Sequence, residues 1–429
     1  MKPLVRSLLS ASIAAAFAVP MAAHATNGYF LPGYGAAATG MGGAGVAFAQ
    51  DSISAATNPA GIVDVGSRAD LGFGIFNPVR SAAVGTAAGA NFAAFNGYSD
   101  SSNRFYMMPS AGMTMAWDDN LSFGIALVGN GGMNTSYREN FFDPGNGTAS
   151  KTLGVDLMQM LVPITAAYKV DEHNAIGASL VLGAQRFAAR GLQAFSLVTS
   201  DSKHLTNNGH DFAQGAGVRL GWRGKFLDDK VTLGATYASK VYMSKFGKYS
   251  GLFAEGGSFD VPANYALGIA VKATPAMTVA FDVERILYSG VPSVHNPGPA
   301  KTIPGIAPNS PYRLGLPDGM GFGWTDQTVY KLGFAYQYNP KWVLRAGYNY
   351  GATPIPGNQV IFNTLAPATV ERHYTVGFTY SLNKSNDLTF AYLQAASNTQ
   401  SACNLTPLVS CATIKMHQND LELAYSWKF

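Results

Sequence analysis

Residues 421–429 read LELAYSWKF, and their side chains alternate strictly between two kinds. The odd positions are all large and apolar, whereas the even positions are Glu422, Ala424, Ser426 and Lys428. Successive side chains of a β-strand point to opposite faces, so one face of this stretch suits lipid and the other suits a polar lumen. The pattern predicts a strand of a membrane-spanning β-barrel.

The composition of the whole chain agrees with this interpretation. Only 13% of its 429 residues are charged, whereas about a quarter are charged in a typical soluble protein. Glycine occurs 48 times, beside 25 phenylalanines and 21 tyrosines, which suits strands with small residues on one face and aromatic residues on the other. After the first 25 residues, no stretch has the roughly 18 consecutive apolar residues of a membrane helix.

Residues 1–25 have the features of a signal peptide. Lys2 and Arg6 precede an apolar run over residues 8–19, and Ala23-His24-Ala25 places small residues where a signal peptidase reads the chain. The run is shorter than the roughly 20 residues of a membrane anchor, so we expect cleavage after Ala25. The remaining charges are scattered and nearly balanced, and no nucleic-acid partner is expected.

Period-two alternation in the rest of the chain predicts fourteen strands. They lie at 68–77, 105–117, 121–129, 157–170, 175–187, 214–224, 230–241, 263–272, 276–286, 328–338, 341–350, 373–382, 387–395 and 419–429. Short and long connections alternate between them, as in even-stranded outer-membrane barrels with short periplasmic turns and long outer loops. A soluble all-β protein has no reason to sort its loops in this way. We therefore predict an all-β fold, a 14-stranded antiparallel transmembrane barrel over residues 67–429.

The stretch from residue 40 to residue 65, GMGGAGVAFAQDSISAATNPAGIVDV, does not look like a strand. A fourteen-stranded barrel has an interior wider than its own side chains can fill, so we expect residues 26–66 to form a plug, or hatch, inside it. The glycines let backbone pack closely. Asn58-Pro59-Ala60 is expected to form a stiff turn, because proline fixes φ and asparagine can bond its own backbone.

The sequence offers little for catalysis or metal binding. No nucleophile, base and orienting group can be named together, although a hydrolase site at the barrel rim stays an alternative. Cys403 and Cys411 share the last long connection, and in an oxidising compartment a disulfide between them is the favoured interpretation. Metal binding or a catalytic thiol is less favoured, because two cysteines without a nearby His or Cys pair make no zinc site. We predict no catalytic residue, metal or cofactor.

Several side chains have the strand parity of the lumen and are candidates for a ligand pocket. The cations Arg219, Lys331 and Arg345 either pair with lumenal acids and the plug, which is the favoured interpretation, or meet an anionic head group. An apolar pocket lining is expected for an apolar ligand. The non-polar residues with lumenal parity are Phe76, Leu161, Val181, Phe187 and Val343.

The order of features along the chain resembles the FadL family, the outer-membrane transporters of long-chain fatty acids and other hydrophobic compounds. These features are a small-residue run, then Asn58-Pro59-Ala60, then a barrel. Further stretches are similar to that family at 118–137, 261–285, 325–356 and 371–383. The resemblance implies a barrel closed by an N-terminal hatch, with Asn58, Pro59 and Ala60 at its gate. It also implies a binding pocket above the hatch and an exit through a lateral opening where the third strand is kinked inward. By position that strand is 121–129, which places the kink at Gly124 or in the run that holds Gly129, Gly131 and Gly132.

We therefore expect diffusive uptake of a hydrophobic small molecule across the outer membrane of a Gram-negative bacterium, with a long-chain fatty acid as the first choice. An aromatic or alkane hydrocarbon is the alternative by the same mechanism. A general porin or a surface adhesin is the rival from another class, and the plug argues against a porin. Further expected partners are outer-membrane lipid, lipopolysaccharide and the barrel-assembly machinery. The C-terminal Phe429 resembles the signal by which that machinery recognises outer-membrane proteins.

Overall fold

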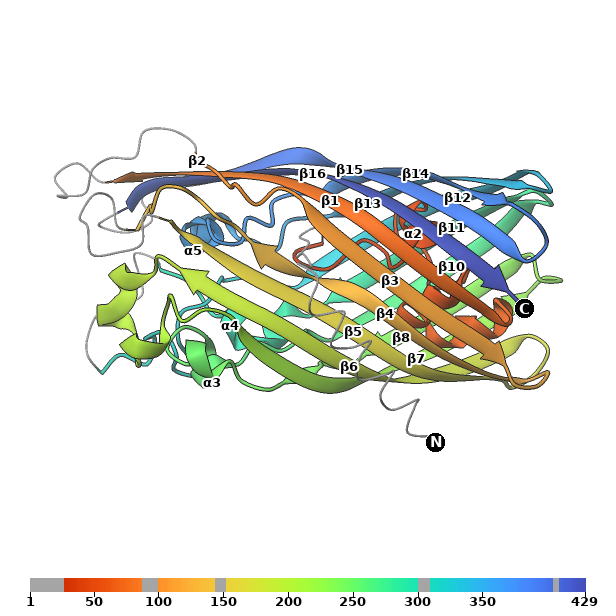
Figure 1. Cartoon of the computed structure of the whole chain (residues 1–429), viewed down its shortest axis with the longest axis horizontal. Coiled ribbons are helices and arrows are strands. Elements are labelled where there is room, and N and C mark those ends of the chain that lie inside the picture. Colours follow the sequence, from red (N-terminus) through yellow and green to blue (C-terminus); the bar gives the residue numbers. More distant parts are fainter. Residues whose placement is uncertain (1–26, 87–98, 143–151, 300–308, 404–408) are drawn as a thin grey trace.

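A closed barrel of fourteen long antiparallel strands makes up most of the computed structural model, which describes residues 27–86, 99–142, 152–299, 309–403 and 409–429 (Figure 1). The long strands are β1 (Arg68–Thr86), β3 (Tyr106–Ala116), β4 (Leu121–Asn134), β5 (Gly154–Lys169), β6 (Asn174–Arg190), β7 (Asp211–Phe226), β8 (Val231–Ala238), β10 (Asn264–Thr274), β11 (Met277–Ile286), β12 (Gln327–Asn339), β13 (Trp342–Gly351), β14 (Arg372–Ser381), β15 (Asn386–Cys403) and β16 (Val409–Lys428). Two strands of two residues each, β2 (Ser99–Asp100) and β9 (Tyr242–Met243), pair with β1 and β7. Pairing of β1 with β16 closes the barrel. The predicted fold class is confirmed, whereas the expected signal peptide lies outside the described residues.

Strands β1, β15 and β16 extend well beyond their predicted ends. β1 includes residues 78–86 of the predicted connection 78–104, and β15 and β16 include residues 396–403 and 409–418 of the predicted connection 396–418, so the assignment of these residues to loops is wrong. The outward positions there include Thr413, Lys415 and His417, which are polar because this part of the wall stands beyond the apolar band. Without a contrast between apolar and polar faces, alternation no longer marks a strand.

Three of the short turns share one hydrogen-bonding pattern. The Asp118 carboxylate accepts from the backbone N–H groups of Asn120 (2.8 Å) and Leu121 (2.7 Å), and these bonds hold the pKa of the Asp118 carboxyl below its usual range. Asp171 and Asn339 accept from the second and third following N–H groups in the same way. Side chains that close a turn on their own backbone explain why the strands reverse within a few residues.

The helices are short and lie inside the barrel or in the long connections. They are α2 (Ala36–Thr39), α3 (Ala254–Gly257), α4 (Pro292–His295) and α5 (Val360–Asn363), with 3-10 turns η1 (Ser52–Ala56), η2 (Pro59–Asp64), η3 (Gln193–Val198), η4 (Ser202–His204), η5 (Gly247–Tyr249), η6 (Tyr288–Gly290) and η7 (Gly357–Gln359). Among the described residues, none of these helices is long and apolar enough to cross a membrane.

The apolar side chains fall into two separate sets. One faces outward in mid-wall and is solvent-exposed in the isolated chain, as at Leu71, Ile125 and Val376. The other is a buried core inside the barrel, between the hatch and the long loops, and it includes Tyr29, Tyr288 and Trp324. The outward set forms the surface expected against lipid, so the lumenal core is the part that concerns ligand handling.

Candidate functional site

The hatch is an irregular segment, residues 27–66, that packs against the inner wall (Figure 1). Its turn η1 contacts β3, β4 and β5, its turn η2 contacts β5, β6 and β7, and its helix α2 contacts β14, β15 and β16. The segment therefore touches both sides of the lumen and obstructs it.

Asn58 holds the central turn of the hatch. Its Nδ2 donates to the carbonyls of Val46 (2.7 Å) and Trp222 (3.0 Å), and its Oδ1 accepts from the Ala60 N–H (3.1 Å) as the cap of η2. The side chain is 1% exposed. One amide thus joins two parts of the hatch and one wall strand, and Pro59 occupies the first helical position, where its missing N–H costs nothing.

Two wall glycines allow the hatch turn to approach this closely. A Cβ at Gly221 would clash with Asn58 Oδ1 and with the ring of Pro59, and a Cβ at Gly177 would lie 2.5 Å from the backbone nitrogen of Ala60. Hatch backbone therefore rests on β6 at Gly177, and the side chains of Asn58 and Pro59 rest on β7 at Gly221. The abundance of glycine is visible in the sequence but this role is not, because alternation does not show what lies on the lumenal side.

Lumenal acids bind hatch backbone. Asp282 on β11 accepts from the N–H groups of Gly45 (2.7 Å) and Val46 (2.9 Å), and Asp70 on β1 accepts from the Ser52 N–H (2.8 Å). Hydrogen bonds to a charged group are stronger than neutral ones. The two acids thus fix the hatch at opposite strands of the wall.

The lumenal cations that were candidates for a head group are engaged as well. Arg219 donates to the carbonyl of Thr57 (2.8 Å), and Arg345 donates to the Gln50 side chain (2.8 Å). Lys331 pairs with Glu284 at 2.8 Å. These contacts agree with the interpretation that the three cations pair with lumenal acids and the hatch.

A gap separates the outer halves of β3 and β4. The two strands pair only from Ala111↔Leu127 to Ala116↔Ser122. Residues 106–110 of β3 pair with β1, and residues 128–134 of β4 pair with β5, but these two stretches do not pair with each other. Beyond the gap, Ser102 N–H donates to the Ser136 carbonyl (2.8 Å). The backbone pairing of β3 with β4 is therefore interrupted over this stretch, and this interruption is called the window below.

The register of β4 shifts at the window. The shift against β5 lies between Gly129 and Gly131, whereas Gly124 lies in regular pairing with Thr165. Past the shift, β4 turns to interior partners, since Gly131 bridges to Phe30 of the hatch and Thr135 Oγ1 donates to a carbonyl of the loop after α5 (2.8 Å). Gly131 has φ of 155°, and a Cβ there would overlap the carbonyl of Tyr29, so only glycine fits. Gly132 follows in register with Met158.

The first hatch residues fill an aromatic enclosure next to this window. The Tyr29 ring lies 5.4 Å from the Tyr288 ring, 5.7 Å from the Trp324 ring and 6.1 Å from the Phe259 ring, measured between centroids. Tyr288 Oη donates to the Asn27 carbonyl at 2.5 Å. The Tyr29 side chain of the hatch thus occupies the space between these three rings. These residues could not be predicted from strand alternation, because Trp324, Phe259 and Tyr288 lie in or beside the long loops.

The predicted pocket residues do not share one cavity, which corrects the expectation. Phe187 lines an apolar cavity of about 30 Å³ under the long loops, and Arg219 and Lys331 line one of about 20 Å³ beside the first hatch residues. Val343 and Arg345 line a third cavity at the opposite end of the barrel. The remaining candidates, Phe76, Leu161 and Val181, are buried in the lumen but line none of these three. Strand parity gives the face of a residue but not its height along the barrel.

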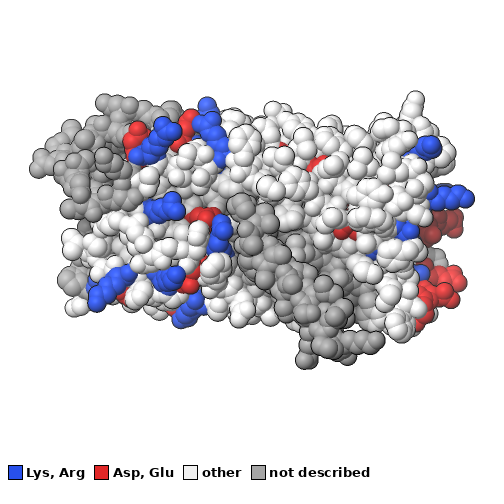
Figure 2. Space-filling view, in the orientation of Figure 1, with Lys and Arg blue, Asp and Glu red and all other residues white. Residues whose placement is uncertain are grey.

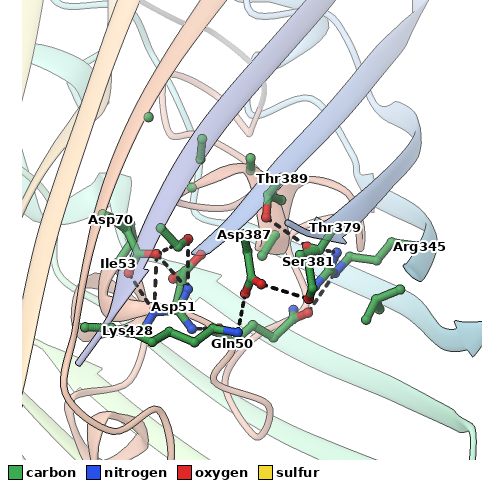
Figure 3. A pocket seen from close by; sticks show the side chains of 18 of the residues that line it. Gln50, Asp51, Ile53, Asp70, Arg345, Thr379, Ser381, Asp387, Thr389 and Lys428 are labelled. Carbon is green, nitrogen blue, oxygen red and sulfur yellow. Dashed lines mark hydrogen bonds and ion pairs between the residues drawn. The ribbon is translucent and has the colours of Figure 1, made fainter. Parts of the chain in front are cut away.

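The third cavity, of about 280 Å³, is polar and lies between the hatch and the wall near the short turns (Figure 3). Its labelled side chains include Gln50 and Asp51 of the hatch and Thr379, Asp387 and Lys428 of the wall. This polar lining favours water over an apolar ligand. We therefore look for the ligand path on the other side of the hatch.

Cys403 and Cys411 form a disulfide between the outer ends of β15 and β16. In the described part of the chain, no three His, Cys, Asp or Glu side chains gather as a metal site.

Residues 14–413 match the family model described as outer membrane protein transport protein (OMPP1/FadL/TodX). The chain belongs to this family. No curated protein was found to match it. Members of the FadL/TodX family transport hydrophobic compounds across the outer membrane, and this chain is accordingly an outer-membrane transport protein.

Solved structures with the same fold include proteins of this family. The toluene transporter TodX of P. putida has 22% identity and a TM-score of 0.66, over 93% of this chain and 99% of that one. A FadL homologue of Pseudomonas aeruginosa has 16% identity and a TM-score of 0.68, over 94% and 100%. The toluene transporter TbuX of Ralstonia pickettii has 20% identity and a TM-score of 0.64, over 93% and 99%. These likenesses concern the fold.

Proposed function

We propose that this FadL-family protein takes up small hydrophobic molecules through the window between β3 and β4, and not along the barrel axis past the hatch. The observation that carries the proposal is the window itself, a break in an otherwise paired wall next to the buried aromatic core. An apolar molecule that leaves sideways enters the membrane and avoids the polar cavity below the hatch. Catalysis has no part in this proposal.

A ligand must create its own space in this conformation. The apolar cavity next to Phe187 measures about 30 Å³, whereas a dry engineered cavity that binds benzene measures about 150 Å³. The segment best placed to yield is Asn27–Leu31, which is joined to β4 by the Leu31 N–H to Asn130 carbonyl bond (3.2 Å) and by the bridge at Gly131. Its departure would leave the rings around Tyr29 to a ligand.

The substrate is a neutral aromatic hydrocarbon or a long-chain fatty acid, and each is supported by one observation. The rings of Phe259, Tyr288 and Trp324 suit a flat apolar ligand, and two of the similar folds belong to toluene transporters. A fatty acid is supported by Arg80, which is 3% exposed, faces the lumen and forms no ion pair within the described part of the chain. Its Nε and Nη1 have no hydrogen-bond partner there, so a carboxylate could satisfy them.

Uptake of labelled toluene and labelled oleate, in cells that lack other transporters of this kind, tests the function and separates the substrates. We expect uptake of one compound well above the vector control. If that compound is oleate, Arg80→Met should lower its uptake roughly tenfold, while toluene uptake stays unchanged. Arg372→Met is the matched control, because the Arg372 guanidinium lies over Tyr350 much as that of Arg80 lies over Tyr106, but on an exposed side chain. Uptake of both compounds at the vector level, with normal surface abundance, would refute the proposed function.

A further inference from the structure

The outer wall changes character at the upper edge of its apolar band. On β1 and β16 the exposed apolar side chains end at Ile75 and Leu421, and the next outward positions toward the long loops are Asn77 and Asn419. In Figure 2, Lys and Arg lie together with Asp and Glu over the third of the molecule that is next to the long loops, further charged residues lie at the opposite end, and few are visible between them. Cations therefore stand where the bilayer interior ends and the head groups begin.

One group of these cations lies beside β1, β3 and β16. The Arg104 carbonyl accepts from Asn77 Nδ2 (2.7 Å), which places Arg104 at the edge of the apolar band, and the neighbouring Phe105 is 74% exposed. Lys415 and His417 are alternate outward residues of β16 and lie opposite Ser81 and Val79 of β1. Three nitrogen-bearing side chains thus share one patch of the outer surface.

The acids near this patch balance only part of its positive charge. Asp100 pairs with Arg104 at 2.8 Å, but both side chains are largely exposed, and such pairs contribute little and rearrange easily. Arg104 also shares an open cleft with Arg138 and Glu139. Arg104, Arg138 and Lys415 outnumber Asp100 and Glu139 by one, so the patch keeps an excess of one positive charge.

A second group lies on β6 and its neighbours. The exposed residues Leu180 and Leu182 show that even-numbered positions of β6 face outward, so Arg186 and Arg190 face outward above them. Arg186 and His210 both contact Asp156, at 3.0 and 2.8 Å. Arg186 Nε has no hydrogen-bond partner among the described residues.

We propose that these two groups form a binding rim for the phosphates of lipopolysaccharide in the outer leaflet. The ligand recognised by these cations is a phosphate on a lipid at the level of the head groups. Apolar side chains next to the cations contact the acyl chains of that lipid. Guanidinium forks suit phosphate oxygens, and cations beside a membrane are attracted to anionic lipid. The proposal concerns the outside of the barrel and is independent of which compound the lumen carries.

Binding of lipid A to the full-length protein in detergent, followed by native mass spectrometry and by the shift in thermal unfolding, tests the rim. We expect phosphorylated lipid A to bind, and the double variant Arg104→Glu/Lys415→Glu to bind it about tenfold more weakly or worse. Arg186→Glu/Arg190→Glu should have a similar effect. Lys341→Glu/Lys384→Glu reverses two exposed lysines of the short turns and serves as the matched control, with unchanged binding.

Two further comparisons decide the source of the phosphate and the role of charge. Dephosphorylated lipid A should bind at least about tenfold more weakly than lipid A, and inorganic phosphate should neither shift unfolding nor compete at millimolar concentration. Equal binding of both lipids, or equal binding by the rim variants and the wild type, would overturn the proposal. Saturable binding of inorganic phosphate with no preference for lipid A would also overturn it. Heat-modifiable migration of every variant confirms that the barrel has folded, so weak binding cannot be ascribed to misfolding.

Discussion

At the residue scale, Asn58 is the side chain whose chemistry is hardest to replace. Its amide donates twice and accepts once, and all three partners are backbone groups in a buried site. Serine or aspartate could cap η2 as well, but neither has an NH₂ that could satisfy the carbonyls of Val46 and Trp222 together. The choice of asparagine therefore reflects contact with the wall and not the turn alone.

Replacement of Asn58 should loosen the hatch without unfolding the barrel. Asn58→Ala leaves two buried carbonyls without donors and removes a cap, which should cost the hatch about 1–3 kcal/mol. We expect faster hydrogen exchange over residues 44–64 and reduced ligand uptake. Asn58→Asp keeps the cap but lacks the donors, so it should resemble the alanine variant. If Asn58→Asp exchanges and transports like the wild type, the tripeptide is only a turn.

At the element scale, β4 departs from the regular barrel where the sequence held several candidate glycines. Gly131 touches hatch backbone and has a backbone conformation that only glycine adopts readily, whereas a Cβ at Gly129 would meet nothing within 4 Å. Gly124 faces the hatch in regular pairing. The two glycines beside the register shift thus form a natural pair for a test.

Gly131→Ala should disturb the window and Gly129→Ala should not. The methyl group at residue 131 would push away Tyr29 and break the bridge to Phe30, so we expect altered uptake and a lower unfolding temperature. Uptake rates and thermal unfolding of the two variants, compared at equal abundance, provide the measurement. Equal behaviour of the two would show that the contact between β4 and the hatch does not control the route.

The outer ends of β15 and β16 form a second exceptional element, pinned by the disulfide between Cys403 and Cys411. The closed loop spans a sequence separation of 8, for which loop-closure entropy suggests about 2.5 kcal/mol of stabilisation. Reduction should increase hydrogen exchange in residues 396–403 and 409–416 only. Residues 419–428, which pair with β1 and β15 inside the membrane band, are the internal control, and loss of protection there would contradict this expectation.

At the scale of the whole molecule, the sequence predicted the barrel well and the site poorly, for one physical reason. Lipid on one side and a polar lumen on the other impose alternation, so the fourteen strands could be counted and residues such as Arg219 assigned to the correct face. Alternation carries no information about height, which is why Phe187 and Val343 were grouped although they line cavities at opposite ends. The aromatic enclosure is formed by tertiary contacts between the hatch and the long loops. The period-two pattern of strands does not predict such contacts.

The contacts of the hatch around the whole barrel distinguish a transporter from a general porin. The hatch is bonded to strands around the lumen, including β1, β7, β11, β14 and β16, so the lumen offers no wide aqueous path. We expect the intact protein to show no large, steady conductance in planar bilayers. Asp282→Ala/Arg219→Ala removes two anchors and should produce intermittent openings, whereas Asp201→Ala, in an outer loop, should not. Large and steady channels from the wild type would favour a porin, because a hatch held by this many bonds cannot leave the lumen often enough to produce them.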